Sequence, residues 1–444
     1  MISASSLVTE VTARSRAAGA YGSGVTTSET PRADDNYLPP MLNPFEPGFF
    51  DDPYRQYAAV RDQDPVHQSP IGAWALFRYE DVLRVLRDPH LSVEERHANL
   101  VEPEYPPDIQ ELRASRAERG NHTMLNLDPP DHHRLRRLVS KVFTPRMIEE
   151  LRGRVQQLVD EHLDAVEARG TGEMDVIADL AFPLPFIVIS EMLGIPDDGD
   201  RAQLREWSGA IVKGFDPILT EDELRAIFDA SDGFWNRAHE IIAWKRANPG
   251  DDLLTGMIAA EDEGDRLTEE ELIEQLTLLY IAGHETTANL IGNGTLALLR
   301  DRPQLELLQR DPSVDATVAD ELLRYDSPVQ MSRRVTLADF RIDDYVIPAG
   351  TMLMTCLGSA NRDPAKWGPD ADRVDLRRES AREHLSFGGG VHSCLGAHLA
   401  RVEGQEALTR LVRRFPNLEL ATDEPEWNGR IVLRGLTRLP VSTG

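Results

Sequence analysis

The sequence is poor in cysteine, in basic residues and in long apolar runs. Only two of its 444 residues are cysteines, Cys356 and Cys394, which excludes a disulfide framework and a zinc site built from cysteines. Acidic residues outnumber basic ones by 75 to 48, and the formal charge of -27 argues against a broad nucleic-acid-binding surface. No apolar stretch could span a bilayer, and residues 1–20 lack the apolar core of a signal peptide. We therefore expect a cytoplasmic protein.

The chain does contain enough apolar material for a large core. Hydrophobic residues make up 41% of it, and its length allows one large domain or two ordinary ones. Residues 1–42 are rich in small and polar residues without apolar periodicity. We expect them to form a mobile extension in front of a single folded domain over residues 43–444.

Helical patterns dominate the folded part. Residues 52–88 predict a helix, a strand and a second helix, and residues 131–300 predict helices that are interrupted where proline and glycine gather. Strand patterns follow at 333–357 and 429–441. Residues 92–121 combine weak periodicity with three prolines, which predicts a long loop. The fold class is mainly α with a minor β-sheet.

One predicted helix carries polar residues in its middle. It begins with the capping box of Thr268 and Glu271 and runs to about residue 300, which gives a length of roughly 48 Å. Glu285 and Thr286 interrupt its apolar centre. A structural interpretation has Thr286 bonding back to a carbonyl and Glu285 pairing with a buried cation. A functional interpretation has the acid and the hydroxyl handling protons in a cavity against Ala282.

The second cysteine lies in the segment HLSFGGGVHSCLGAHLAR, residues 384–401. Helical periodicity begins just after Cys394, so amide donors and the helix dipole would favour its thiolate. Glycines on both sides leave room for a flat group, and a thiolate beneath a flat group suggests haem iron. Three different interpretations stay open at this point: a phosphate site, which lacks the lysine of a P-loop, a nucleophilic cysteine with His392 as base, and a buried structural cysteine.

The spacing of Phe387, Gly390, His392, Cys394 and Gly396 resembles the cysteine-ligand loop of the cytochrome P-450 family, the haem-thiolate monooxygenases. The resemblance extends from about residue 43 to residue 440 and is closest to soluble bacterial members. It implies one P-450 domain, with haem b between the long central helix and the cysteine loop and with Cys394 as the axial ligand of the iron.

The resemblance also implies roles for further residues. Glu285 and Thr286 match the acid and alcohol pair that delivers protons. The haem would contact His132, Arg136, Ala282, Arg334, Phe387, Gly388, His392 and Gly396. Glu321 and Arg324 match an ion pair that braces the core, with Arg373 as the expected partner and Arg378 as a rival.

The resemblance also implies where the substrate and the electron donor bind. Substrate would lie against Leu278, Ile281, Ala282, Val329, Gln330 and Ile431, with residues 92–121 and 182–234 as a lid. Arg134, Arg137 and Lys141 form a basic face on the helix that carries His132. The resemblance implies that an acidic electron donor docks there through electrostatic steering.

The implied reaction is activation of dioxygen with hydroxylation or epoxidation of a mid-sized, largely apolar molecule. A polyketide, terpenoid or steroid of secondary metabolism would fit. No cysteines remain for an iron-sulfur cluster, so electrons would come from NAD(P)H through a separate ferredoxin and its reductase. A peroxide-using enzyme is disfavoured because the acid and alcohol pair is intact. A haem-binding protein without turnover stays possible, as does a cysteine hydrolase if no haem binds.

Overall fold

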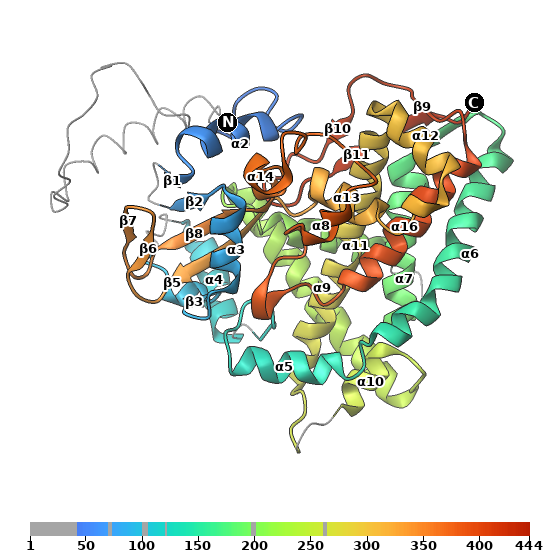
Figure 1. Ribbon diagram of the computed structural model, residues 1–444. Coiled ribbons are helices and arrows are strands. Elements are labelled where there is room, and N and C mark those ends of the chain that lie inside the picture. Colours follow the sequence, from blue (N-terminus) through green and yellow to red (C-terminus); the bar gives the residue numbers. More distant parts are fainter. Residues whose placement is uncertain (1–41, 70–72, 100–104, 120–121, 197–200, 261–263) are drawn as a thin grey trace, which may run out of the picture.

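The computed structural model describes residues 42–69, 73–99, 105–119, 122–196, 201–260 and 264–444. The expected extension, residues 1–42, lies outside this part except for Leu42. Most of the described chain is helical (Figure 1). The α-helices are α2 (Tyr54–Gln63), α3 (Tyr79–Arg87), α4 (Pro107–Arg119), α5 (Asp131–Ser140), α6 (Pro145–Arg169), α7 (Pro183–Leu193), α8 (Arg201–Lys213), α9 (Glu221–Ala247), α10 (Leu253–Ala259), α11 (Glu269–Arg300), α12 (Arg302–Arg310), α13 (Val318–Tyr325), α14 (Leu357–Ala360), α15 (Pro364–Trp367) and α16 (Ala397–Arg414).

Short helical turns and strands complete the element order. The turns are η1 (Glu95–His97), η2 (Ile177–Ala181), η3 (Pro312–Val314), η4 (Glu379–Glu383) and η5 (Gly390–His392). The strands are β1 (Val66–Gln68), β2 (Trp74–Leu76), β3 (Leu91–Ser92), β4 (Glu173–Asp175), β5 (Met331–Thr336), β6 (Phe340–Ile342), β7 (Tyr345–Ile347), β8 (Met352–Cys356), β9 (Glu419–Leu420), β10 (Glu426–Trp427), β11 (Leu436–Arg438) and β12 (Pro440–Ser442).

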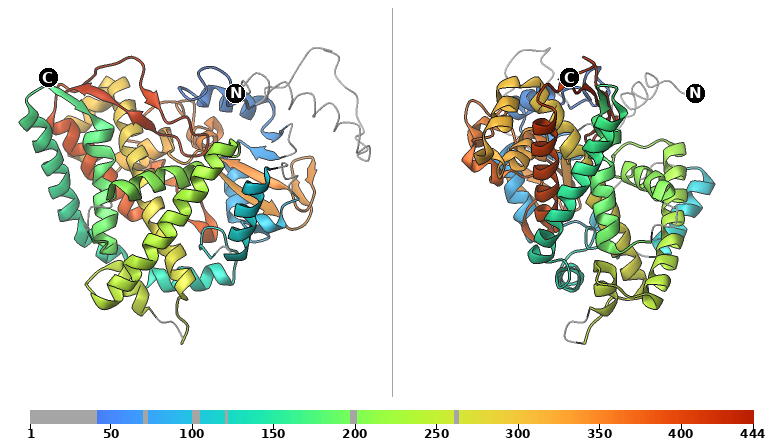
Figure 2. Two further views of the ribbon diagram at one scale, coloured as in Figure 1. Left: turned by 180° about the vertical axis from the view of Figure 1, so that it is seen from behind. Right: turned by 90° about the vertical axis from the view of Figure 1, so that its right-hand side faces the viewer.

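The largest sheet lies to one side of the helices (Figures 1 and 2). Its five strands run in the order β1-β2-β8-β5-β3, and β5 pairs antiparallel with β8 from Met331 opposite Cys356 to Val335 opposite Met352. Three smaller sheets are β4-β12-β9, β10-β11 and β6-β7. The prediction of a mainly α fold with a minor sheet is confirmed.

Helix α11 runs through the middle of the helical part, where it contacts α7, α9, α13 and α16. Its 32 residues begin after the predicted capping box, in which the Thr268 side chain accepts from the Glu271 N–H and the Glu271 side chain accepts from the Thr268 N–H. Most of its second half is buried. No helix of the described residues combines the length and apolarity needed to cross a membrane.

The prediction of a long loop over residues 92–121 is wrong, because α4 lies within it. Pro107 opens this helix, where a fixed φ and a missing N–H are tolerated, and the following residues are mostly good helix formers. The apolar periodicity was weak because α4 packs through few side chains. Ile109 is fully buried against Leu224 and Phe228 of α9.

Candidate functional site

A cavity of about 300 Å³ lies between α11, α5, the start of α16 and the loop that precedes α16. Much of its wall is apolar, with Leu278 and Leu290 from α11 and Val329 and Leu357 from the sheet side. Its polar lining includes Cys394 and two basic side chains of α5. The cavity therefore brings together residues that lie more than 250 positions apart in the chain.

Cys394 lies deep within the protein, and its exposed surface faces this cavity. Its N–H donates to the carbonyl of Phe387 over 2.9 Å, and α16 begins shortly afterwards at Ala397. Burial raises the pKa of the Cys394 thiol, although the Gly396 N–H and the cations of Arg136 and Arg401 act in the opposite direction. The predicted effect of an amide at the helix start is therefore present, but burial outweighs it in the chain by itself. A bound metal ion would deprotonate the sulfur.

Two glycines of the loop have positive φ, for different reasons. Gly390 has φ of +68°, and a Cβ there would lie 2.6 Å from the carbonyl oxygen of Leu86, so the loop packs against α3 only with glycine. Gly388 has φ of +66° and lines the cavity, where an added Cβ would meet only the His392 carbonyl at 3.8 Å. A flat group can approach this backbone closely.

Four basic side chains form a cluster at the cavity. His132 and Arg136 of α5 and His392 line the cavity, whereas Arg334 of β5 is not among its lining residues and acts on His392 through its charge. The ring centres of the two histidines lie 4.2 Å apart. Burial lowers the pKa of His132 to about 4 and that of His392 to about 3, and neighbouring cations of the same cluster add to both shifts. Burial also lowers the pKa of Arg136, and it brings that of Arg334 to about 10.

The acid that acts on this basic cluster is Asp128, through its charge on His132 and Arg334 and without an ion pair. Among the described residues, neither ring nitrogen of His132 has a hydrogen-bond partner, and neither Arg136 nor Arg334 forms an ion pair with an acid. Buried cations without partners are costly, so the cluster is suited to an anionic ligand that enters the cavity.

The middle of α11 forms the opposite wall. Ala282 is exposed although it lies in the centre of a buried helix, because it faces the cavity together with Thr286. The Thr286 hydroxyl donates to the Ala282 carbonyl over 2.9 Å, which is the back-bond that the structural interpretation expected. Since the hydroxyl also borders the cavity, the functional interpretation stays compatible with this bond.

Glu285 does not line the cavity. Its carboxylate forms an ion pair with Arg430, and both side chains are largely buried, at 14% and 15% exposure. The buried cation that the structural interpretation expected is therefore present. The acid lies beside Thr286 in sequence but is held by a cation from the C-terminal part of the chain.

Comparison with known proteins agrees with this geometry. The profile of the cytochrome P-450 family matches residues 73–311 and 296–434. The chain is 42% identical to Cytochrome P-450 107B1 of Saccharopolyspora erythraea, over 91% of this chain and 98% of that protein. It is 37% identical to 6-deoxyerythronolide B hydroxylase of the same organism, over 88% of this chain and 96% of that protein.

The chain belongs to the cytochrome P-450 family. It is a haem-dependent monooxygenase, and the cysteine hydrolase hypothesis falls. Among solved structures, the polyketide synthase cytochrome P-450 PksS of Bacillus subtilis superposes with a TM-score of 0.81 at 38% identity, covering 91% of this chain and 100% of that one. The predicted single P-450 architecture is thereby confirmed.

The residues of this P-450 fit a haem. Cys394 offers a sulfur in the cavity wall, and Phe387, Gly388 and Gly396 line the same wall. The unpartnered ring nitrogens of His132, the ring of His392 and the guanidinium groups of Arg136 and Arg334 would suit the two propionate carboxylates. Ala282 has the small side chain that the opposite face of a flat ring requires.

The predicted substrate-contacting residues fall into two groups. Leu278, Ala282 and Val329 line the cavity. Ile281, Gln330 and Ile431 are not among its lining residues. They are buried elsewhere, and the Gln330 amide donates to the Tyr54 hydroxyl over 2.9 Å and to the Ser327 carbonyl over 2.6 Å.

The brace of Glu321 and Arg324 is present, but its predicted partner is wrong. Both residues are fully buried and joined by two bonds of 2.8 Å. The side chain of Arg378, not of Arg373, lies 3.4 Å from Glu321. Arg373 is exposed and contributes its carbonyl, which accepts from Arg324 over 2.6 Å.

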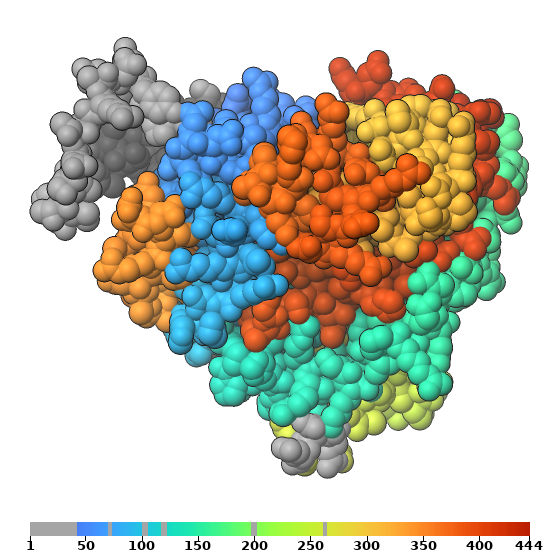
Figure 3. All heavy atoms as spheres, viewed as in Figure 1, coloured from blue at the N-terminus to red at the C-terminus, as the bar shows by residue number. Residues whose placement is uncertain are grey.

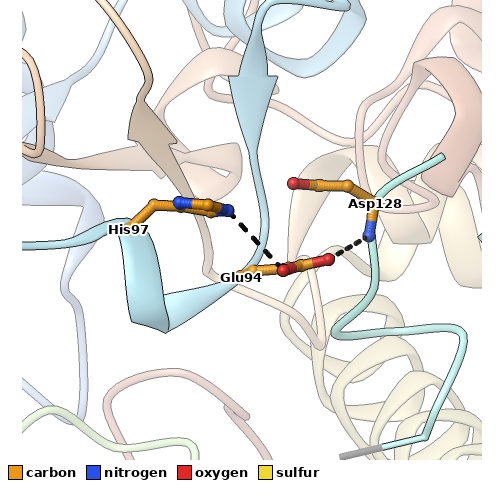
Figure 4. A group of neighbouring side chains, drawn as sticks. All are labelled: Glu94, His97 and Asp128. Atoms are coloured by element: carbon orange, nitrogen blue, oxygen red, sulfur yellow. Dashed lines mark hydrogen bonds and ion pairs between the residues drawn. The ribbon is translucent and has the colours of Figure 1, made fainter.

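A small acidic cluster lies beside the basic one (Figure 4). The Glu94 carboxylate accepts from the Asp128 N–H over 3.0 Å and lies 3.6 Å from the His97 ring. Arg96 also pairs with Glu94. The Asp128 carboxylate accepts from the Val93 N–H over 2.9 Å, so the chain already uses these oxygens. The cluster fixes the segment that leads into α5.

Two groups near the site were missed by sequence reasoning. Arg430 lies in an irregular segment whose sequence carries no motif, so its contact with α11 could not be predicted. Glu403 lies on the apolar face of α16 and is 1% exposed, and its carboxylate oxygens have no partner among the described residues. Burial raises the pKa of Glu403 well above its usual value, with Thr287 acting in the opposite direction. An acid at an apolar helix position was the available signal.

Proposed function

We propose that this P-450 hydroxylates or epoxidises a mid-sized, largely apolar molecule of secondary metabolism, such as a polyketide, terpenoid or steroid, in the cytoplasm. The apolar wall formed by Leu278, Leu290, Val329 and Leu357 supports such a substrate. The names of two relatives, a 6-deoxyerythronolide B hydroxylase and a polyketide biosynthesis P-450, favour the polyketide class.

When bound, the haem supplies reductive activation of dioxygen. The residues of the chain hold its iron at Cys394 and its carboxylates at the basic cluster. Thr286 borders the cavity and is suited to hold a proton at its hydroxyl. Glu285, the acid that precedes it in sequence, is suited to supply the next proton. This assignment rests on Thr286 lining the cavity one turn beyond Ala282.

Electrons come from NAD(P)H through a ferredoxin and its reductase, which dock on the exposed side of α5. Arg137 and Lys141 are exposed there. Arg134 pairs with Glu271 and lies 3.4 Å from Asp265, so part of its charge is neutralised within the chain. Figure 3 shows a face on which the teal segment that contains α5 adjoins the orange and red segments near the cysteine loop.

Replacement of Thr286 tests the proton role. Thr286→Ala is expected to divert reducing equivalents into peroxide, with product per NAD(P)H falling by about tenfold or more. Thr277→Ala is a matched control, because this hydroxyl makes the same back-bond on α11, to the Ile273 carbonyl over 2.8 Å, and does not line the cavity. Unchanged product yield in Thr286→Ala would refute the role of the hydroxyl.

A further inference from the structure

The segment that carries Arg430 contacts two helices at once. One terminal nitrogen of Arg430 pairs with Glu285 of α11, and the other donates to the carbonyl of Gly209 in α8 over 3.0 Å. The planar fork of arginine allows the two contacts from separate nitrogens, whereas lysine offers a single ammonium. Because the pair with Glu285 is largely buried, solvent screens it weakly.

The same segment is also fixed to the end of α8. The N–H groups of Ile431 and Val432 both donate to one carboxylate oxygen of Asp216, over 3.0 and 2.9 Å. Asp216 is 5% exposed and lies 3.0 Å from the ammonium of Lys213, the last residue of α8. The position of Arg430 therefore depends on where α8 ends.

A third contact joins the two helices directly. His284 Nδ1 lies 2.7 Å from the Tyr280 carbonyl, which can only accept, so Nδ1 carries the hydrogen. Nε2 is then an acceptor, and the Ser208 hydroxyl donates to it over 3.1 Å. Adjacent residues of α8, Ser208 and Gly209, are thus linked to adjacent residues of α11, His284 and Glu285.

We propose that Arg430 is a positioning residue that couples α8 to the acid of the proton-delivery pair. While α8 lies against the C-terminal segment, Arg430 holds the Glu285 carboxylate at a fixed place outside the cavity. Movement of α8 breaks the bond between Arg430 and Gly209 and releases the carboxylate. The functional half of this inference rests on the proposed role of Glu285 and Thr286, whereas the link between the helices does not.

The link is tested first without turnover. Amide hydrogen exchange is measured on the haem-loaded resting protein for the wild type, Arg430→Gln and Arg438→Gln. Arg438 is a matched control because it lies in the same C-terminal region and its nearest acids are Asp175 and Glu426, each at 3.4 Å. Faster exchange in α8 and in residues 428–432 of Arg430→Gln alone is expected. Wild-type exchange in Arg430→Gln would refute the coupling.

The effect on the acid is tested by combining variants. Arg430→Gln is expected to lower product per NAD(P)H about three- to tenfold, and Arg430→Lys is expected to lower it less. In a Glu285→Gln background, adding Arg430→Gln should not lower the product yield below that of Glu285→Gln alone. Losses that add in the double variant would refute action through Glu285. If Thr286→Ala and Glu285→Gln leave the yield unchanged, the proposed proton role fails, and the exchange result still decides the link.

Discussion

Two buried arginines, Arg324 and Arg334, differ in how the surrounding chain stabilises their positive charge. Arg324 is fully buried and uses its guanidinium in full, with two bonds to Glu321 and three to the carbonyls of Asn361, Ala371 and Arg373. Arg334 is 5% exposed and donates to the carbonyl of Arg333 over 2.7 Å and to the Ser332 hydroxyl over 3.5 Å. It forms no ion pair among the described residues, and Asp128 acts on it only through its charge.

This difference distinguishes an arginine that stabilises the fold from one that is suited to bind a ligand. A buried cation whose partners all come from the chain belongs to the framework of the fold. A buried cation whose pKa is lowered, and whose basic neighbour His392 lines a cavity, indicates a place for an anion that the chain does not supply. The two arginines should therefore respond differently to substitution.

The largest effect is expected at the framework arginine. Arg324→Leu leaves the buried Glu321 carboxylate with Arg378 as its remaining cation, so the free energy of unfolding should fall by about 3–5 kcal/mol. Chemical denaturation followed by circular dichroism measures this loss. A change below about 1 kcal/mol would contradict the framework role.

A smaller and different effect is expected at the cavity. Arg334→Gln should leave the fold in place and speed the loss of haem to an acceptor protein by about 10- to 100-fold, since a hydrogen bond to a charged group contributes about 1.5–3 kcal/mol. Arg333→Gln is the matched control, because this exposed neighbour on β5 pairs with Glu95. Equal haem loss in the two variants would remove Arg334 from the haem site.

The basic cluster also predicts a pH dependence for the haem-free chain. The pKa of His132 falls from 6.5 to about 4 on folding, so the unfolded chain binds more protons below pH 6.5. The free energy of unfolding should therefore decrease as the pH falls from about 6.5 to about 4. His132→Gln should flatten this slope in urea titrations, whereas replacement of its exposed neighbour, His133→Gln, should not. Equal slopes would contradict the burial of a neutral His132.

The smallest effect is expected on the surface. Arg137→Glu with Lys141→Glu should raise the ferredoxin concentration needed for half-maximal turnover by a few-fold at low salt, because rim charges act mainly on association. The difference should vanish at high salt. Arg341→Glu on β6 is a charge control away from α5, and an equal effect there would refute docking on α5.

The sequence could predict the features that depend on local pattern. The capping box of Thr268 and Glu271 needs only residues three apart, and the spacing around Cys394 is specific enough to indicate its ligand role. The α4 helix was missed because its apolar face is short. The choice between Arg373 and Arg378 could not be made, because it depends on which side chain turns inward after a bend.

Contacts between distant segments could not be predicted either, because they depend on how the chain packs in three dimensions. The pair of Arg430 with Glu285 joins residues 145 positions apart, and no periodicity brings them together. The burial that raises the pKa of Cys394, against the Gly396 amide and the cations around the sulfur, was also beyond prediction from the sequence. Both depend on packing in three dimensions, whereas the basic cluster was anticipated only through its family resemblance.

The carbon monoxide difference spectrum of the dithionite-reduced protein tests the central claim most directly. A red-shifted Soret band in the wild type that is lost in Cys394→Ala is the predicted result, because it requires a thiolate on the iron. Cys356→Ala is the control, since this second cysteine is buried away from the cavity. A colourless wild type, or a red-shifted band that persists without Cys394, would contradict the account.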